Sequence, residues 1–582
     1  MTLLRPYSAD AALGRARGRY LADALVLAGM AALFWLLVRL AHGVNAPFNR
    51  VSAPSSVSTD PAALPYYAAR SLLRMFVALG ASTLFTLVYA TAAARLRRAE
   101  KVLVPILDVL QSVPVLGFLS VTLTMWLTLF PHSVLGVECA SVFAIFTSQA
   151  WNMTFAFYQS LVTQPRELDE AARALRLTRW QRFWKLDVPN GMIPLVWNAM
   201  MSFGGGWFFL VASEVISVNN HTYALPGIGS YVASASEHGQ VGRMLLAVVV
   251  MVAMVIGVNA VFWRPLTAWA ERFRVENAVA AEVPRSVMLA LLRRSALPAL
   301  AGRGLRPVGR TLDRLTRPFG LAEYPLQEHP RRRRAGDAAF VVAVTALVGW
   351  GLWRMLGYVE RHTGLGEFGH AFLLGLATLG RVMVLLVASS LVWVPVGVWI
   401  GMNPRVSRYA QPVVQVLASF PANFLFPLFT LLLIRTGISI DVGGIFLMAL
   451  GAQWYILFNV IAGASAIPTD LREAVTSLGL GRRQRWRSLI MPAIFAAWVT
   501  GAITAAGGAW NASIVAEVVS YRHTTLTAYG LGAYITQSTA AGNFARTLVG
   551  VSVMSVYVVG LNRLLWRRLY RLAETRFSLQ QG

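Results

Sequence analysis

Long apolar runs alternate with short polar segments along this chain of 582 residues. Most runs reach the ~20 residues that a helix needs to cross a bilayer, so the pattern predicts an all-α, polytopic membrane protein with about twelve transmembrane helices, six in each half. The runs lie near 24–42, 72–94, 115–130, 139–160, 192–215, 243–263, 338–356, 371–401, 421–434, 442–463, 493–515 and 545–565. Those near 115–130 and 421–434 are short, and each is expected to borrow residues from the helix before its proline.

The two halves carry one sequence pattern twice. A constant offset of 303 residues relates the second copy to the first over a long stretch without a gap, and further upstream the offset becomes 307, as between Arg74 and Arg381. The matched pairs include Glu170 with Glu473, Gly204 with Gly507, Trp207 with Trp510, Glu214 with Glu517, and Tyr231 with Tyr534. Internal repeats of this kind are a recurring architecture of transport proteins, and the pattern predicts two homologous halves.

Composition agrees with a membrane protein. Hydrophobic residues make up 56% of the chain and charged residues only 13%, whereas about a quarter of the residues of a soluble domain are charged. The single cysteine, Cys139, excludes a disulfide within the chain and is too little for a cysteine-based metal site. It is expected to be a small apolar filler.

Basic residues predict the orientation in the membrane, because Lys and Arg accumulate in cytoplasmic loops. Alternate loops are rich in arginine, among them the N-terminal arm, the stretch 173–185 and the connector 264–334, whereas loops such as 358–368 and 519–541 carry far fewer. Both termini are therefore predicted to be cytoplasmic. The net charge of +26 is spread over these loops, which argues against nucleic acid as a partner.

Two charged segments on the predicted cytoplasmic side are too polar to span a membrane. Each begins just after a proline, Pro165 or Pro468, places acidic residues early and basic residues later, and ends at the proline that opens the next span. This order suits short helices, because the helix dipole favours acids at the N-terminus and bases at the C-terminus. The segments are predicted to form docking surfaces for another protein.

The segment Glu170-Ala171-Ala172 and its copy Glu473-Ala474-Val475, each followed further on by a Pro, resemble the coupling loop of permease subunits from binding-protein-dependent ABC importers. The resemblance implies the type I importer permease fold in a bacterial plasma (inner) membrane. It also implies two ATP-binding cassette subunits on the cytoplasmic side, contacted by Glu170 and Glu473, and an extracytoplasmic substrate-binding protein.

The first coupling segment departs from the family pattern at one position. Arg176 stands where the family has glycine and where the second copy has Gly479. This difference predicts a less sharp turn in the first copy and two coupling segments that are not equivalent.

A second signature is similar to the permeases of nitrate, sulfonate and taurine importers. It comprises a glycine pair followed by Trp and then an acidic residue, and it reads Gly507-Gly508-Ala509-Trp510 with Glu517 in the second half and Gly204-Gly205-Gly206-Trp207 with Glu214 in the first. The resemblance implies a small anion as the transported solute.

The same resemblance divides the chain into permease domains and flanking parts. The expected parts are 1–65, an N-terminal arm with the first span and an outer loop; 66–264, the first permease domain; 265–335, a basic cytoplasmic linker; 336–370, an extra span with an outer loop; 371–566, the second permease domain; and 567–582, a cytoplasmic tail. The linker contains a candidate amphipathic helix near 285–296, suited to lie on membrane lipid. The alternative is that the linker is a spacer that only joins the two halves.

Six residues are candidates for the translocation path or its gate. Several interpretations remain open. Glu214 and Glu517 are gate elements, or partners of Arg74 and Arg381, or they face interfacial water. Trp207 and Trp510 close the path, or they pack or anchor at the interface. Arg74 and Arg381 attract an anion, or they reach towards the membrane surface.

No catalytic chemistry is evident. The chain has only two lysines, Lys101 and Lys185, and neither belongs to a phosphate-binding Gly-rich motif. No cofactor or metal site is expected, and ATP hydrolysis is assigned to a separate subunit. An ion-coupled secondary transporter with two related halves is the main alternative, and a lipid-modifying membrane enzyme is a third; the repeated glutamates in cytoplasmic segments favour the importer.

Overall fold

The computed structural model describes residues 23–24, 26–28, 55–112, 115–131, 133–218, 221–273, 287–295, 303, 307, 309, 311–316 and 330–576. The predicted first span near 24–42 lies almost wholly outside these residues, as do the N-terminal arm and most of the predicted linker. Within the linker, a short helix is present at α12 (Val287–Arg294), inside the predicted range 285–296.

The first half is a succession of helices interrupted by one β-hairpin. Its elements are η1 (Pro61–Ala63), α2 (Leu64–Arg95), α3 (Arg97–Ser112), η2 (Val115–Phe118), α4 (Leu119–Leu129), α5 (Leu135–Val162), α6 (Arg166–Ala174), α7 (Arg179–Arg182), η3 (Phe183–Asp187), α8 (Val188–Glu214), β1 (Val215–Val218), β2 (His221–Ala224), α9 (Ile228–Glu237), α10 (Val241–Val258), η4 (Asn259–Trp263), α11 (Arg264–Ala270) and η5 (Glu271–Phe273).

The second half repeats this order after one additional helix. Its elements are α14 (Pro330–His362), α15 (Gly366–Met402), α16 (Pro404–Ser419), η7 (Ala422–Leu425), α17 (Phe426–Thr436), α18 (Ile440–Ser465), α19 (Thr469–Ser477), α20 (Arg482–Arg485), η8 (Trp486–Ile490), α21 (Met491–Ala516), β3 (Val518–Tyr521), β4 (Thr524–Thr527), α22 (Leu531–Ala540), α23 (Phe544–Leu561), η9 (Asn562–Trp566) and α24 (Arg567–Arg576). Even the π-helical turns η3 and η8 recur at the same place, which confirms the duplication.

The predicted number of spans is not confirmed. Among the described residues, eight helices are long and apolar enough to cross a membrane, or nine if α16 and α17 with η7, which are bent by 76° at their break, form one span. In the first half, α4 has only 11 residues. The helix α5 has 28 residues but is less apolar than the eight, because it carries buried polar side chains such as Glu138 and Gln149. These side chains face protein rather than lipid, so hydropathy alone misjudges this helix.

Each half is built around a central helix held between two others. In the first half α5 packs between α2 and α8, and in the second half α18 packs between α15 and α21. The halves also interlock. Val115 and Leu116 of η2 belong to an apolar core made mostly of second-half side chains, and Phe424 of η7 belongs to the core of the first half. Each half therefore completes the core of the other.

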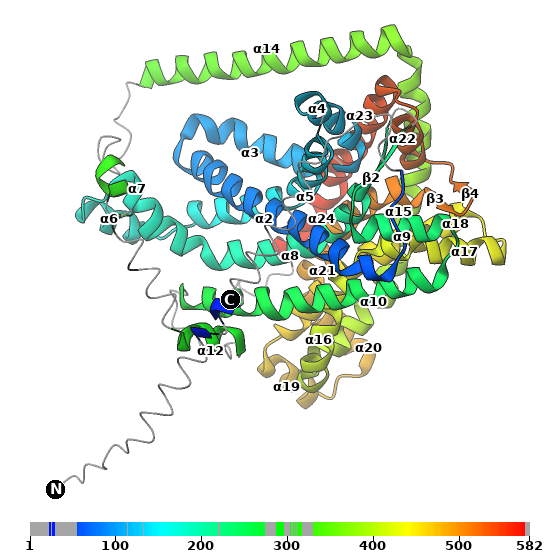
Figure 1. Ribbon diagram of the computed structural model, residues 1–582. Helices are drawn as coiled ribbons and strands as arrows, with labels where there is room; N and C mark the ends of the chain where they lie inside the picture. The colour runs from blue at the N-terminus through cyan, green and yellow to red at the C-terminus, as the bar shows by residue number, and fades with distance from the viewer. Residues whose placement is uncertain are drawn as a thin grey trace.

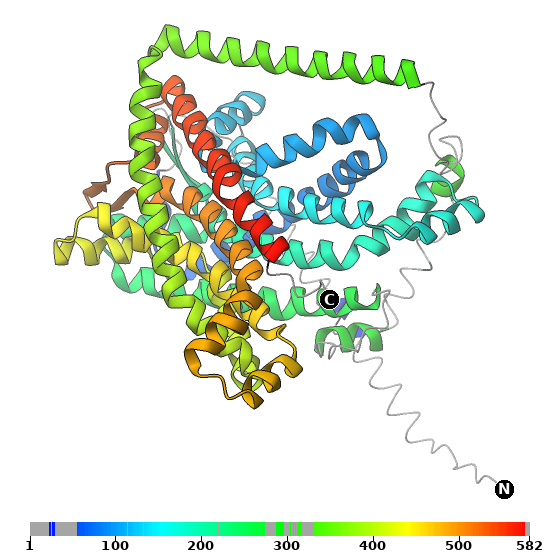
Figure 2. The ribbon, with the colours of Figure 1, turned by 180° about the vertical axis from the view of Figure 1, so that it is seen from behind.

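The extra helix α14 stands apart from the rest. It runs along the edge of the molecule in both views (Figures 1 and 2), and none of its most apolar stretch is buried. Its large side chains are exposed, with Trp350 at 59% and Trp353 at 75%. Such a surface suits contact with lipid tails, as expected of a span at the rim of a membrane protein.

The hairpins were not predicted. Strands β1 and β2 pair antiparallel, with Val215 opposite Ala224, and β3 pairs with β4 in the matching register, with Val518 opposite Thr527. Helices α6 and α7 lie at the left of Figure 1 and α19 and α20 at its bottom, away from β2, β3, β4 and α22 at the right. The two predicted docking segments thus lie opposite the hairpins.

Candidate functional site

The two predicted coupling segments contain short helices of equal length. Helices α6 and α19 have nine residues each and begin after Pro165 and Pro468, with acidic residues in the first turn. Their repeated glutamates, Glu170 and Glu473, are exposed, as are Ala171 and Ala474, whereas Ala172 is only 2% exposed. Both glutamates are thus free to meet a partner.

The turn after each of these helices is the same, contrary to the expectation for Arg176. Arg176 adopts a left-handed backbone with φ of 46°, and Gly479 has φ of 63°. In both copies an amide reaches back over the turn, from Leu177 to Ala172 O at 3.0 Å and from Leu480 to Val475 O at 3.3 Å. The expected difference in the sharpness of the turn is therefore wrong: arginine accepts the conformation that glycine adopts more easily.

Arg176→Gly is expected to stabilise the first turn by about 1 kcal/mol, because a side chain in the left-handed region costs about that much. Gly479→Ala should destabilise the second turn by a similar amount, since a Cβ there would meet nothing within 4 Å and the cost is conformational. Hydrogen exchange of the peptides containing Leu177 and Leu480 measures both changes. Equal exchange in Arg176→Gly and the parent protein would contradict the predicted strain.

A buried cluster of charges lies at the hairpin end of the first half. Arg74 donates to Glu138 Oε2 at 2.6 Å from Nε and to Glu214 Oε1 at 2.7 Å from Nη1. Arg70 also donates to Glu138, and Ser71 donates to Glu214 Oε1 at 2.5 Å. Glu214 is 0% exposed and Arg74 2%. The interpretations that Glu214 faces interfacial water and that Arg74 reaches towards the membrane surface are therefore wrong.

The second half builds the same cluster with fewer charges. Arg381 donates to Glu517 Oε1 at 2.8 Å and to Asp441 Oδ1 at 2.5 Å, and Thr378 donates to Glu517 Oε1 at 2.8 Å. Glu517 is 0% and Arg381 8% exposed, so the water-facing and membrane-surface interpretations are wrong here as well. The side chain of Asp441, in contrast, is 49% exposed.

These clusters fix the chain where it leaves each hairpin. Glu214 accepts from the Gly229 amide at 2.7 Å, and Ser71 accepts from the Ile228 amide at 3.0 Å. A Cβ at Gly227 would lie 2.2 Å from the Glu214 carboxylate, and one at Gly530 would lie 2.3 Å from that of Glu517. Glycine is thus required by close approach. The first cluster joins α2, α5 and the start of α9, and the second joins α15, α18 and the start of α22.

Sequence reasoning missed the second acid of each cluster, Glu138 and Asp441, and it missed Arg70 in the first cluster. Glu138 and Asp441 are separated by the repeat offset of 303 residues, and both are acids inside or beside an apolar run. An acidic residue at one repeat position in both halves is the signal that would have identified them.

A cavity of about 520 Å³ lies between the two halves. It is lined by both glycine pairs, Gly204-Gly205 of α8 and Gly507-Gly508 of α21, and by polar side chains of α5, α8, α18 and α21. The polar side chains include Thr147, Ser148, Asn152, Asn198, Ser202, Tyr455, Asn459, Thr500, Thr504 and Asn511. No Asp, Glu, Lys or Arg of the described chain lines it. The cavity therefore offers neutral hydrogen-bond donors and acceptors without a formal charge.

The repeated tryptophans occupy different surroundings. Trp510 lines the cavity, stacks on Tyr557 at 5.8 Å between ring centroids, and has a buried indole N–H without a hydrogen-bond partner among the described residues. Trp207 is absent from the cavity wall and packs edge-on against Phe203 at 5.5 Å. Both side chains are only 1% exposed. Arg74, Arg381, Glu214 and Glu517 do not line the cavity either.

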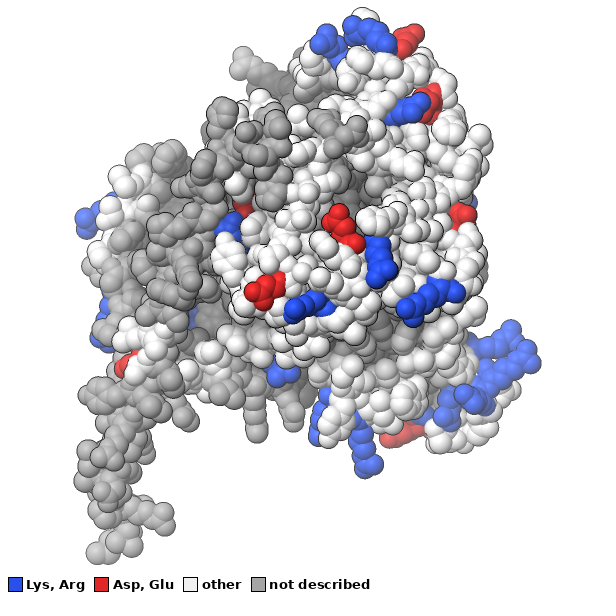
Figure 3. Space-filling view, turned by 45° about the vertical axis from the view of Figure 1, so that its right-hand side comes forward, with Lys and Arg blue, Asp and Glu red and all other residues white. Residues whose placement is uncertain are grey.

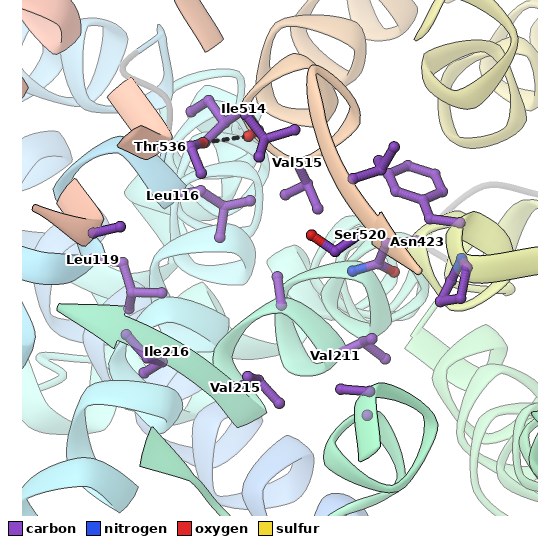
Figure 4. Close-up of a pocket in the computed structure, with 18 of the residues that line it drawn as sticks. Leu116, Leu119, Val211, Val215, Ile216, Asn423, Ile514, Val515, Ser520 and Thr536 are labelled. Atoms are coloured by element: carbon purple, nitrogen blue, oxygen red, sulfur yellow. Dashed lines mark hydrogen bonds between the residues drawn. The ribbon is translucent and has the colours of Figure 1, made fainter. Parts of the chain in front are cut away.

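A second, mostly apolar pocket of about 330 Å³ lies on the hairpin side. Side chains from both halves surround it, including Leu116, Ile216 and Ile514 (Figure 4). The turns η2 and η7 separate the two spaces, since Val115 and Ala422 line the cavity whereas their neighbours Leu116 and Asn423 line the pocket.

Two hydrogen bonds hold these turns to the opposite half. The Val115 amide donates to Asn511 Oδ1 at 3.0 Å, and Asn423 Nδ2 donates to Phe208 O at 2.9 Å. Each bond joins a turn of one half to the cavity-lining helix of the other. The partition between cavity and pocket is therefore made jointly by both halves.

Charged side chains are sparse among the described residues on the face seen in Figure 3. Lys and Arg gather there most densely at the lower right edge, and most of the other described surface is uncharged. Among the described residues, no group of three or more His, Cys, Asp and Glu side chains could hold a metal ion.

Comparison with protein families gives the same match twice. The model described as "Binding-protein-dependent transport system inner membrane component" matches residues 82–272 and again residues 394–578. Together these ranges cover more than half of the chain and coincide with the two halves of the fold.

Individual relatives are similar at lower identity. The taurine transport system permease protein TauC of Escherichia coli is 29% identical over 199 residues, which is 33% of this chain and 68% of the relative. The nitrate import permease protein NrtB of Synechocystis is 25% identical over 199 residues, 34% of this chain and 67% of the relative. The bicarbonate transport system permease protein CmpB of Synechococcus elongatus is 25% identical over 144 residues, 25% of this chain and 50% of the relative.

Proposed function

Because the chain belongs to the family of binding-protein-dependent transport system inner membrane components, we propose that its two halves form the path through which an ABC importer moves a small anion across a bacterial plasma (inner) membrane. The observation that carries this proposal is the uncharged cavity between α8 and α21, built from the repeated glycine pairs of both halves. The duplicated type I permease fold places equivalent helices on both sides of it. Adjacent glycines allow helices to approach closely.

Glu170 and Glu473 couple ATP hydrolysis to the path. They are exposed on α6 and α19, at the side of the molecule away from the hairpins, where two ATPase subunits would dock with one on each half. Ala171, Ala172, Ala474, Arg176 and Gly479 shape the same surfaces. ATP hydrolysis belongs to these partners. Both termini of the chain lie on this cytoplasmic side, and a substrate-binding protein docks on the side of the hairpins.

The remaining candidate residues divide into two roles. Trp510 lines the path, and Trp207 supports α8 from within the first half. The arginine–carboxylate clusters around Glu214 and Glu517 hold the hairpin ends rather than contact the solute, because they are buried away from the cavity. The parts 66–264 and 371–566 act as the two permease domains, with 265–335 as a cytoplasmic linker that can contact lipid, and 1–65, 336–370 and 567–582 as flanking parts.

The proposed solute follows from the relatives and the cavity together. The relatives named above are a taurine, a nitrate and a bicarbonate permease, and the cavity wall has amide and hydroxyl groups suited to oxygen-bearing solutes. A site with neutral donors binds an oxyanion weakly enough for release. Uptake of labelled nitrate, bicarbonate and taurine by cells with and without the chain separates these three solutes.

Affinity purification of the tagged chain from its native membrane tests the proposal. The unmodified chain is expected to recover an ATPase subunit, and Glu170→Arg/Glu473→Arg is expected to recover at least tenfold less, since reversed charges at an interface oppose docking. A chain with reversed charge at Glu237 and Glu360, which are both exposed and lie outside α6 and α19, serves as the control. Failure of the folded, unmodified chain to recover any ATPase overturns the proposal in favour of an ion-coupled transporter.

A further inference from the structure

The two coupling segments share an anchor. Besides the repeated glutamates, each presents one large apolar side chain at the same repeat position, Leu175 at 71% exposure and Leu478 at 72%. An exposed leucine on an otherwise polar segment is suited to burial against a partner. This common pair of groups accounts for docking of both segments on ATPase subunits of one kind.

The side chains around the shared anchor differ in charge. Positions that hold Trp180 and Trp184 in the first half hold Arg483 and Arg487 in the second, at the repeat offset of 303 residues. In the first half the two tryptophans contact each other at 5.6 Å between ring centroids, and Trp184 is 46% exposed. Arg483 and Arg487 are both exposed. An aromatic surface is thus replaced by a guanidinium surface.

The first segment also neutralises its own charges. Arg182 pairs with Asp169, and Arg95 donates to Asp187 Oδ1 at 2.5 Å. Arg182 Nε lies 3.7 Å from the same Asp187 oxygen. Arg182 and Arg95 are therefore paired with acids of the chain itself.

The second segment has lost each acidic partner. Arg472 and Ile490 stand at the positions of Asp169 and Asp187. Arg485, the counterpart of Arg182, forms no ion pair with a described residue and donates to Thr476 Oγ1 at 3.4 Å. Across the described residues, neither Arg483 nor Arg487 forms an ion pair. Exposed arginines without an acid of their own are available for a carboxylate of a partner.

We propose that α20 and the turn η8 dock on an acidic rim of an ATPase subunit, which Arg483 and Arg487 contact, whereas α7 and η3 dock through the tryptophans. The inference rests on the proposed function and goes beyond it, since it gives the two docking surfaces different chemistry. Charge complementarity identifies the partner surface: carboxylates meet guanidinium groups in a geometry that favours paired hydrogen bonds. The two halves then bind their ATPase subunits with different dependence on salt.

Arg483→Trp/Arg487→Trp, which installs the residues of the first half, tests the proposal in the full chain. In nanodiscs of phosphatidylcholine, the affinity for the ATPase subunit that co-purifies with the chain is measured at 50 and 500 mM NaCl. The variant is expected to bind about tenfold more weakly at low salt, because it loses two exposed ion pairs that each contribute a small free energy. It is also expected to lose most of the salt dependence of binding, because salt screens such pairs. Arg405→Trp/Arg408→Trp removes two exposed arginines of α16 and should bind as the parent does.

If Arg483→Trp/Arg487→Trp leaves the affinity for the ATPase subunit and its salt dependence unchanged, the proposal that these arginines contact an acidic rim is overturned. A defect that is seen only in nanodiscs containing phosphatidylglycerol would also overturn it and assign the arginines to anionic lipid. An unchanged midpoint of thermal unfolding verifies that the variant is folded. Failure of the unmodified chain to bind any ATPase is a different outcome, which refutes the proposed function itself.

Discussion

Arg74→Met is expected to lower the free energy of unfolding by about 3–5 kcal/mol, the usual cost of leaving a buried charge without its partner. Glu138 would keep Arg70, but Glu214 is 0% exposed and would lose the cation that lies 2.7 Å away. The thermal unfolding midpoint of the detergent-purified chain, followed by tryptophan fluorescence, measures the change.

The double variant Arg74→Met/Glu214→Gln serves as the control for this prediction. It removes both members of the pair and leaves a neutral amide whose oxygen can accept from the Gly229 amide while its NH2 group donates to the Ser71 hydroxyl. It should regain most of the lost stability, because a buried pair is worth little net once its desolvation is counted. A double variant as unstable as Arg74→Met would show that packing of the arginine, rather than its charge, stabilises the hairpin end.

Asn198→Asp is expected to slow uptake of a monovalent anion by about 10²-fold. Asn198 lines the cavity, which has no formal charge among its described residues. One negative charge about 5 Å from the solute, at an effective dielectric constant of about 20, raises the barrier for an anion by about 3 kcal/mol. Uptake of the transported anion by cells producing each variant at matched levels measures the effect.

Asn198→Leu separates the added charge from the lost amide, and it should slow uptake far less than Asn198→Asp. Asn459→Asp adds a charge to the opposite wall of the same cavity and should act in the same direction. Faster uptake in both Asp variants would mean that the solute is a cation. Equal uptake in all variants would place the path elsewhere.

The repeat offset accounts for most of what could be predicted. Pairing Glu170 with Glu473 and Pro189 with Pro492 aligns two halves whose helices, π-helical turns and hairpins do correspond. The family match at 82–272 and 394–578 confirms the resemblance that the coupling motifs indicated. The repeat could be recognised from this one sequence, because the two halves of a duplicated chain can be aligned with each other.

Short elements escaped prediction for a physical reason. Strands β1 and β3 have four residues each and continue directly from apolar helices, so the alternation that marks a strand has no room to appear. The bend of 76° between α16 and α17 similarly divides one predicted span into two pieces at Pro421. The turns η2 and η7 are held by hydrogen bonds to the opposite half, and such contacts cannot be read from the local sequence.

The walls of the cavity were also beyond the reach of the sequence. Helices α8 and α21 are apolar almost throughout. The few polar residues of α21 that line the cavity, Thr500, Thr504 and Asn511, do recur at helical spacing, but such a stripe does not say which neighbouring helix it faces.

Pairing of Arg74 with Glu214 and of Arg381 with Glu517 was one of the open interpretations. The pairs of the same arginines with Glu138 and Asp441 escaped prediction, because a lone arginine in a span reads equally well as one that reaches the membrane surface. The acids that hold them are distant in sequence, Glu138 by 64 residues and Asp441 by 60.

The unequal walls of the cavity bear on how such a path can change over generations. In a pore made of two identical chains, every substitution appears on both sides at once. Here Phe208 and Asn511 occupy equivalent positions on opposite walls, and the asparagine bonds to the Val115 amide while phenylalanine contributes only its carbonyl, to Asn423. A single mutation therefore alters one wall alone, so selection can adjust each side of the path independently and reach combinations that a symmetric pair cannot encode.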